Sequence, residues 1–274
     1  MPSSLEAITP AGAYRQLKPG LLNREVFPPR DPARTSPFIV LAEDLIEPGM
    51  ESFGMHPHRG FETVMLQLKG SNAFEDSLGD TGVTGPGDVE WTCAGRGILH
   101  GGRPVGDERL HSLQLWLNLP AALKTAPPGM RNQSFADTPT IRKDGVTTTV
   151  YAGRHGGVVQ PHLSLWPLTL IETRLDAGRS VTFEIGAGTR AFAYVVDGAA
   201  TVDGAPVAGG HVAWFRRVDE ASTATLTAQG GAHLVYYASV PIDEPVALGG
   251  PFVMNSEAEI QAAYADLKAG RIGR

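Results

Sequence analysis

Ten short stretches of alternating apolar and polar residues are the feature that most limits what this chain can fold into. They are rich in Val, Ile, Thr and aromatic residues, and Gly, Asp or Pro bounds them, as is typical of strands. Their regular spacing without intervening helices favours sandwiches or barrels. The sequence therefore predicts an all-β protein with strands over residues 37–46, 62–70, 88–95, 111–120, 145–153, 163–175, 180–185, 190–198, 211–217 and 232–241.

One helix is predicted, near the C-terminus. Ser256 can cap its first turn, and Glu259 follows three residues later as in a capping box. Ile260, Tyr264 and Leu267 then form one apolar face at helical spacing. We interpret this amphipathic helix as a packing element without chemistry of its own.

The strand pattern occurs twice along the chain. VMLQLKGS (64–71) resembles FAYVVDGA (192–199), and LQLWLNLP (113–120) resembles LVYYASVP (234–241). The length of 274 residues suits two domains of ordinary size. We therefore expect two β-barrels of one type, residues 1–130 and residues 131–274, with the C-terminal helix in the second.

Composition excludes several classes of partner. The net charge is −6 and no Lys/Arg cluster is present, so no direct binding of nucleic acid is expected. No apolar run of about 18 residues predicts a membrane span, and no secretory signal is recognisable. The single cysteine, Cys93, excludes an intrachain disulfide. The expected compartment is the cytoplasm.

The stretch MHPHRGFE carries the chemistry most clearly. His56 and His58 are two residues apart, so on an extended chain they point to one side and can converge on one ion. His100, in GRGILHGG, is the third candidate ligand. Glu62 can share their face if the strand is unbroken, whereas a bulge at Gly60 would spoil that parity. Three histidines with a carboxylate or water suit iron, and also nickel, copper or manganese. The alternative is that the histidine pair is only a polar feature of the surface.

The second half of the chain lacks these histidines. When the two repeats are aligned on their glycine turns, Glu184 and Gly186 stand opposite His56 and His58. Any metal is therefore expected in the first half alone.

Several motifs together resemble the pirin family, a branch of the cupins. They are HPHRGFETV, GSNAFEDSLGDTG, PGDVEWTCAGRGILHG and LQLWLNLP, with PFIVLAED near the start and DEPVALGGPFVMNSEAEIQAAYADLKAG at the end. The resemblance covers nearly the whole chain. It implies a bicupin, two jelly-roll-type β-barrels facing each other, with one metal, usually Fe(II), in the N-terminal barrel. His56, His58 and His100 match three of the family's metal-binding positions.

The fourth family ligand is a glutamate two residues after the third histidine, and that position here is Gly102. Losing this anion raises the charge of the site, opens a coordination position and should weaken metal affinity. Three alternatives stay open. The site uses three histidines, or Glu62 swings in as a substitute, or the metal and the activity have been lost.

Two functions are implied by the resemblance. Some pirins are oxidoreductases with quercetin 2,3-dioxygenase (quercetinase) activity, which opens a flavonol ring with O2 and releases carbon monoxide. Others regulate or bind protein partners, with the metal structural, redox-sensing or absent. For the first function Glu62 is the candidate base, and a monomer is expected. The expected lining of the substrate pocket is Phe61, Trp91, His111 and Leu115.

Overall fold

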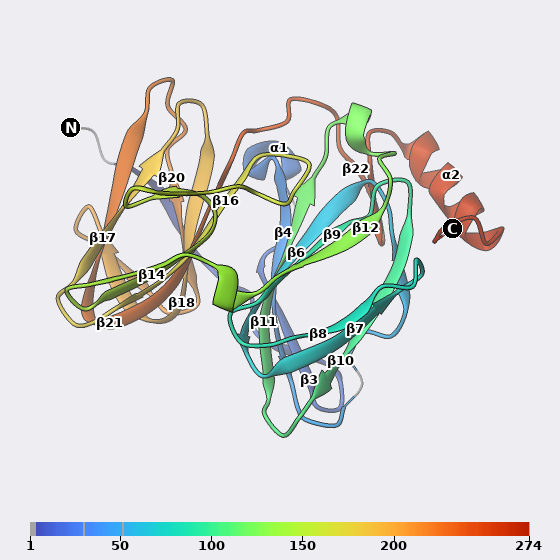
Figure 1. The fold of residues 1–274 in the computed structure, drawn as a ribbon. Helices are drawn as coiled ribbons and strands as arrows, with labels where there is room; N and C mark the ends of the chain where they lie inside the picture. The colour runs from blue at the N-terminus through green and yellow to red at the C-terminus, as the bar shows by residue number, and fades with distance from the viewer. Residues whose placement is uncertain (1–3, 30, 51, 274) are drawn as a thin grey trace. The chain divides into compact units, whose positions relative to one another are not determined.

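The computed structural model describes residues 4–29, 31–50 and 52–273. It divides into two compact units, one made of residues 13–136 and 242–274 and the other of residues 1–12 and 137–241. Both units are built mainly of antiparallel strands (Figure 1), which confirms the predicted all-β class. Within the described residues no helix is long and apolar enough to cross a membrane.

Two sheets form the first unit, which contains the candidate histidines. The larger sheet has the strand order β12-β9-β6-β11-β4-β3-β2, and the smaller has the order β5-β10-β7-β8. Side chains of both sheets meet between them, since His58 of the smaller sheet contacts Phe61 and Trp116 of the larger. The strands of the larger sheet are β2 (Arg15–Lys18), β3 (Leu21–Phe27), β4 (Phe38–Ile46), β6 (Phe61–Lys69), β9 (Val89–Cys93), β11 (Leu110–Asn118) and β12 (Gly129–Gln133). Those of the smaller sheet are β5 (His56–His58), β7 (Ser71–Asp76), β8 (Thr81–Thr84) and β10 (Ile98–Val105).

Short helices and a small hairpin complete the chain around these sheets. They are α1 (Pro32–Thr35), the 3-10 turns η1 (Ala121–Leu123) and η2 (Phe135–Asp137), the hairpin of β22 (Ala247–Gly249) and β23 (Phe252–Met254), and the C-terminal α2 (Glu257–Lys268).

A single hydrogen-bonded sheet of ten strands makes up the second unit. Its main path runs β1-β20-β18-β21-β16-β14-β13, with β15 on β14, β17 on β21 and β19 on β18. The strands are β1 (Leu5–Pro10), β13 (Thr140–Lys143), β14 (Val146–His155), β15 (Val158–Gln160), β16 (Leu168–Leu175), β17 (Ser180–Ile185), β18 (Arg190–Val202), β19 (Ala205–Ala208), β20 (His211–Phe215) and β21 (Ser222–Ser239).

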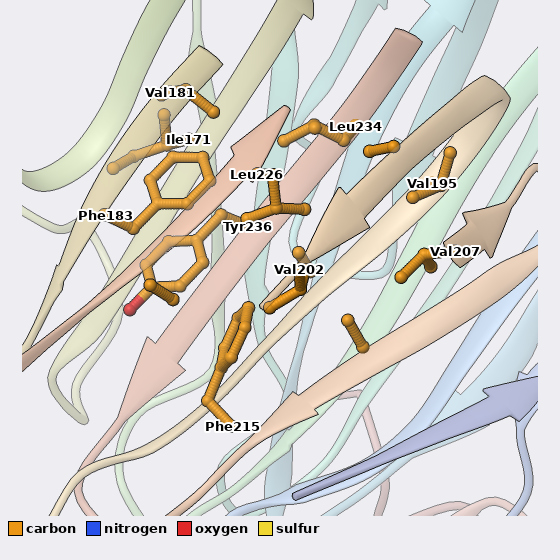
Figure 2. Close-up of a cluster of buried hydrophobic side chains, with 14 of the residues drawn as sticks. Ile171, Val181, Phe183, Val195, Val202, Val207, Phe215, Leu226, Leu234 and Tyr236 are labelled. Carbon is orange, nitrogen blue, oxygen red and sulfur yellow. The ribbon is translucent and has the colours of Figure 1, made fainter. Parts of the chain in front are cut away.

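The second unit has a dense apolar interior. In β17, Val181, Phe183 and Ile185 are buried while the residues between them are exposed, which is the alternation expected of a strand with one buried face. Figure 2 shows Phe183 beside Tyr236, and their rings stack with centroids 4.3 Å apart. Among the described residues, the group of side chains suited to hold a metal lies in the first unit instead.

The predicted domain boundaries need a correction at both ends of the chain. The first strand, β1, pairs with β20 and so belongs with residues 137–241, because its backbone extends that sheet. The C-terminal segment belongs with the first unit and not with the second. Its residues Ile260 and Ile272 share an apolar cluster with Leu99 of β10, and this burial holds the segment there.

The predicted C-terminal helix is confirmed. Ser256 caps it by accepting a hydrogen bond from the backbone of Glu259, whose carboxylate in turn accepts from Asn255 N. Ile260 is buried, whereas Tyr264 is partly exposed and meets Phe252 edge-on.

Lys124 ties the C-terminal segment to the barrel. Its ammonium group is buried and donates to Gly60 O at 2.8 Å, Asn118 Oδ1 at 2.7 Å and Val253 O at 2.9 Å. Gly60 itself has φ +85°, and a Cβ there would collide with Val253 O, so only glycine fits at this close approach. These contacts fix the chain directly after His58.

Lys124→Met should therefore lower the free energy of unfolding by about 3 kcal/mol, because three buried acceptors would lose their donor. Urea denaturation measures this effect. Lys143→Met, at an exposed position, is the matched control and should change the stability by less than about 0.5 kcal/mol. Equal stability of the two variants would contradict this role of Lys124.

Candidate metal centre

Strand pairing brings the three histidines together. β5 runs antiparallel to β10, so His56 lies directly opposite His100 and His58 lies opposite Ile98. Residues that are opposite each other, or two apart on one strand, point to the same face. The three ring centroids are 4.7, 4.6 and 5.1 Å apart, and the candidate ligand atoms all lie within 4.8 Å of one another. One ion can therefore be reached by all three rings.

Hydrogen bonds select the ring nitrogen that faces this point. His56 Nδ1 lies 2.8 Å from Gly54 O, and His58 Nδ1 lies 3.3 Å from Pro251 O. An Nδ1–H that donates to a carbonyl leaves the Nε2 lone pair for a metal. His100 Nε2 is buried and has no hydrogen-bond partner among the residues that the structure describes. A metal ion would satisfy this atom, so the donor set fits one.

Burial keeps the imidazoles neutral. Removal from water, with a smaller contribution from His56, lowers the pKa of His100 to about 3. Burial and the two neighbouring rings hold the pKa of His58 well below its usual range, and burial also lowers the pKa of His56. Neutral imidazole is the form that binds metals, so the rings are ready to bind at neutral pH.

A small cavity adjoins the histidines. Its volume is about 40 Å³, enough for about one water molecule beside an ion and far below the several hundred Å³ of a pocket for a drug-sized ligand. Both sheets supply its wall, and most of the side chains are polar. The lining includes Asp44, Ser52, Phe53, Met65, Asn72, Glu90, Ser112 and Gln114.

Asn72 fills the space that a side chain at position 102 would enter. A Cβ placed on Gly102 would lie 2.7 Å from Asn72 Nδ2 and 2.9 Å from Asn72 Oδ1. Asn72 is buried in β7, next to the strand that carries Gly102. β10 thus offers no side-chain ligand at position 102, and the neutral amide of Asn72 occupies the space where such a side chain would start.

The strand register does not bring Glu62 to the histidines, contrary to the prediction. Glu62 of β6 lies opposite Leu117 on one side and Cys93 on the other. The residue of β6 that lines the cavity is Met65, whose partner Gln114 lines it too. Positions 62 and 65 have opposite parity, so they point to opposite faces of β6. The parity argument failed because β5 ends before Gly60 and β6 begins after it, in a different sheet.

Three of the four predicted pocket residues also face away from the cavity. Leu115 and Trp91 lie beside Val64, on the same face as Glu62. His111 lies opposite Leu45, and its Nε2 is 2.6 Å from Glu43 Oε1. Its neighbour in the strand, Ser112, lines the cavity, so the side chain of His111 points to the other face of the sheet. Both faces of this sheet are buried, so hydrophobicity alone could not distinguish them.

The fourth, Phe61, lies on the side of the histidines. Its ring centroid is 5.0 Å from that of His58, and Trp116 lies 5.2 Å from His58 and 4.4 Å from Phe61. The two aromatic rings pack against His58 and limit its rotation.

Sequence reasoning missed two buried acids in the wall, Glu90 and Asp44. Burial, together with the neighbouring charge of Asp76, raises the pKa of Glu90 to about 7, although a hydrogen bond from Thr92 opposes the shift. The sequence signal for Glu90 was its place between Val89 and Trp91, since an acidic residue inside an apolar strand indicates a buried carboxyl group.

Asp44 predicts a distinct pH dependence of stability. Burial raises its pKa to about 6, against the opposing hydrogen bond from Asn23. Between about pH 4 and pH 6 the native state therefore binds more protons than the unfolded state, and the free energy of unfolding due to this group falls as the pH rises. Asp44→Asn should stabilise the protein by about 2 kcal/mol near pH 7.5 and by less than about 1 kcal/mol near pH 4. Urea denaturation at the two pH values checks this, and a pH-independent difference would contradict it.

The fold and the histidine cluster define a bicupin with a candidate three-histidine centre in one barrel. Comparison with known families makes the assignment specific: the chain belongs to the pirin family. Residues 12–117 match the family model described as pirin, and residues 170–273 match the pirin C-terminal cupin domain.

Individual relatives agree with this assignment. A Pseudomonas aeruginosa protein whose name gives it provisionally as a quercetin 2,3-dioxygenase is 36% identical over 87% of each chain. Human pirin is 36% identical over 81% of this chain and 78% of its own. A solved structure of quercetin 2,3-dioxygenase from Acinetobacter baumannii is 28% identical, covers 99% of this chain and 98% of its own, and superposes with a TM-score of 0.91.

Proposed function

We propose that this protein is a metal-dependent cupin oxygenase of the quercetin 2,3-dioxygenase type, which opens a flavonol or a related enolic aromatic with O2. The observation that carries the proposal is the meeting of three neutral imidazoles, with His100 Nε2 buried and free to bind. The names of the Pseudomonas and Acinetobacter relatives support the substrate class. Fe(II) is the metal we propose, and nickel, copper and manganese are alternatives that the same donors accept.

Residues of this chain would bind the metal, hold one of its ligands in position and limit the space beside it. His56, His58 and His100 would bind through Nε2, leaving coordination positions for substrate and O2. A bound metal would supply Lewis acidity that lowers the pKa of an enolic hydroxyl. Phe61 and Trp116 would keep His58 in place. Because the cavity has room for about one water molecule, the rings of a flavonol would lie outside it.

Metal analysis followed by turnover tests this proposal. The purified protein is loaded in turn with iron, nickel, copper or manganese, and loss of quercetin absorbance is measured together with O2 uptake and carbon monoxide release. We expect about one metal per chain and equimolar O2 uptake and carbon monoxide release with at least one metal. Absence of turnover with every metal would overturn the catalytic proposal.

A second function, a non-catalytic pirin that regulates a protein partner, is favoured by Gly102 and by the small cavity. Human pirin is a relative at the same level of identity. One equivalent of metal bound without turnover would support this function. In either case we propose a cytoplasmic monomer, which size-exclusion chromatography with light scattering can check for its oligomeric state.

A further inference from the structure

The three histidines differ in what stands behind them. His56 and His58 each direct Nδ1 at a backbone carbonyl, Gly54 O and Pro251 O. Behind His100 stands a carboxylate, since Glu90 Oε1 lies 3.9 Å from His100 Nδ1. The oxygen near Nδ1 is thus at hydrogen-bond distance for His56 and His58 but 3.9 Å away for His100, whose Nε2 is buried without a partner among the described residues.

Glu90 is held in an unusual environment for a carboxylate. It lies in β9, is only 3% exposed and lines the cavity beside His100. Thr92 Oγ1 donates a long hydrogen bond of 3.4 Å to Oε1, while Oε2 is buried and lacks a partner within the described residues. A buried acid so weakly satisfied is destabilising for a fold, which indicates a role other than packing.

The other two buried acids near the site, Asp76 and Asp44, each accept hydrogen bonds from other groups, although Asp76 Oδ2 is buried without a partner within the described residues. Asp76 lies opposite His100 in the pairing of β7 with β10. Its Oδ1 accepts the backbone N–H groups of Leu78 and Asp80 and so closes the turn after β7. Asp44 accepts from Asn23. Glu90 alone among these three has an oxygen within 4.0 Å of a histidine of the cluster in the described structure.

We propose that Glu90 is the acidic residue of this metal centre and acts through His100. Its carboxylate lies 3.9 Å from His100 Nδ1, beyond hydrogen-bond distance in this structure. A small approach of the two side chains would let it accept the Nδ1–H, fix the tautomer in which Nε2 carries the lone pair, and place a negative charge next to the cation. This inference rests on the proposed metal centre. The negative charge of the site then comes from β9. Glu90 contacts the ion only through His100 and is therefore a positioning residue.

Metal affinity with matched variants tests the proposal. Dissociation constants for nickel and zinc are measured by competition with a chromophoric chelator for the full chain, Glu90→Gln and Asp44→Asn. Both substitutions replace a buried carboxyl group that lines the same cavity with an amide of the same shape. Partners that orient metal ligands typically contribute about 10–100-fold to affinity. We expect that loss for Glu90→Gln and less than about a 2-fold change for Asp44→Asn.

The tautomer of His100 gives a second readout, independent of activity and of metal. Nitrogen-15 NMR of the metal-free protein should show the Nδ1–H tautomer of His100, and Glu90→Leu should shift it toward a mixture. His58, which donates to a carbonyl, should keep its tautomer in both proteins.

The outcomes separate this inference from the proposed function. If the parent chain binds metal and Glu90→Gln binds it equally well, the inference is wrong and the metal centre stands. Equal losses in Glu90→Gln and Asp44→Asn would also overturn it. If the parent chain binds no metal, the proposed function fails. In that case an Nε2–H tautomer for His100 in the parent chain would refute the placement of Glu90 as well.

Discussion

Replacing His100 with alanine should abolish stoichiometric metal binding. His100 is the one ligand candidate of β10, and its Nε2 is buried without another partner among the described residues. Removing a ligand itself should weaken affinity by more than the ~100-fold that marks the upper range for residues behind the ligands. Chelator competition measures the dissociation constant, and metal content after gel filtration confirms it.

A matched control is available in the second unit. His162 is exposed, and its Nδ1 lies 2.8 Å from Ser164 O. His162→Ala should bind metal as the parent chain does. If both variants retained one tightly bound metal per chain, the metal would have to lie elsewhere and the proposed centre would be wrong.

Placing a carboxylate ligand at position 102, where the family resemblance implies a glutamate, should require two changes and not one. The backbone at Gly102 allows a side chain, since its φ lies outside the left-handed region, but Asn72 occupies the adjoining space. In Gly102→Glu alone the new Cβ would meet Asn72 Nδ2 at 2.7 Å, so the glutamate would be displaced or Asn72 would have to move. The double variant Asn72→Ala/Gly102→Glu removes this obstacle.

The double variant should bind nickel at least about 10-fold more tightly than the parent chain, because an anionic ligand is added to three neutral ones. Gly102→Glu alone should show a smaller gain and a lower melting temperature. Asn72→Ala alone is the control and should leave affinity within about 2-fold of the parent. A double variant with unchanged affinity would show that position 102 does not face the ion.

The histidine cluster could be predicted from the sequence because it depends on local rules. Two residues with one between them share a face of any strand, so His56 and His58 required only that the chain be extended. His100 was a candidate because the family resemblance matched it to a metal-binding position, and the pairing of β10 with β5, which no sequence pattern predicted, brings it opposite His56.

Glu62 shows where such rules stop. Counting by twos from His58 assumes one continuous strand, and the turn at Gly60 moves the chain from one sheet to the other. The prediction that Trp91 and Leu115 line the pocket was wrong for a related reason. Alternation says that neighbouring residues face opposite ways, but when both faces are buried it does not say which face holds the cavity.

The ends of the chain could not be assigned from repeats. The pairing of β1 with β20 and the packing of Ile272 on Leu99 join residues far apart in sequence, and no local pattern encodes such contacts. The same holds for Pro251 O, the oxygen beside His58 Nδ1. Pro251, which follows the second unit in the sequence, thus helps to orient the metal-ligand candidate His58 of the first unit.

X-ray absorption spectroscopy of the zinc-loaded protein tests the central claim most directly. We predict three imidazole nitrogens at about 2.0–2.1 Å from the zinc, with the outer-shell scattering that identifies histidine rings, and one ring fewer in any residual zinc of His100→Ala. A zinc environment of oxygen atoms without ring scattering would contradict the account. So would a protein that retains no zinc after gel filtration.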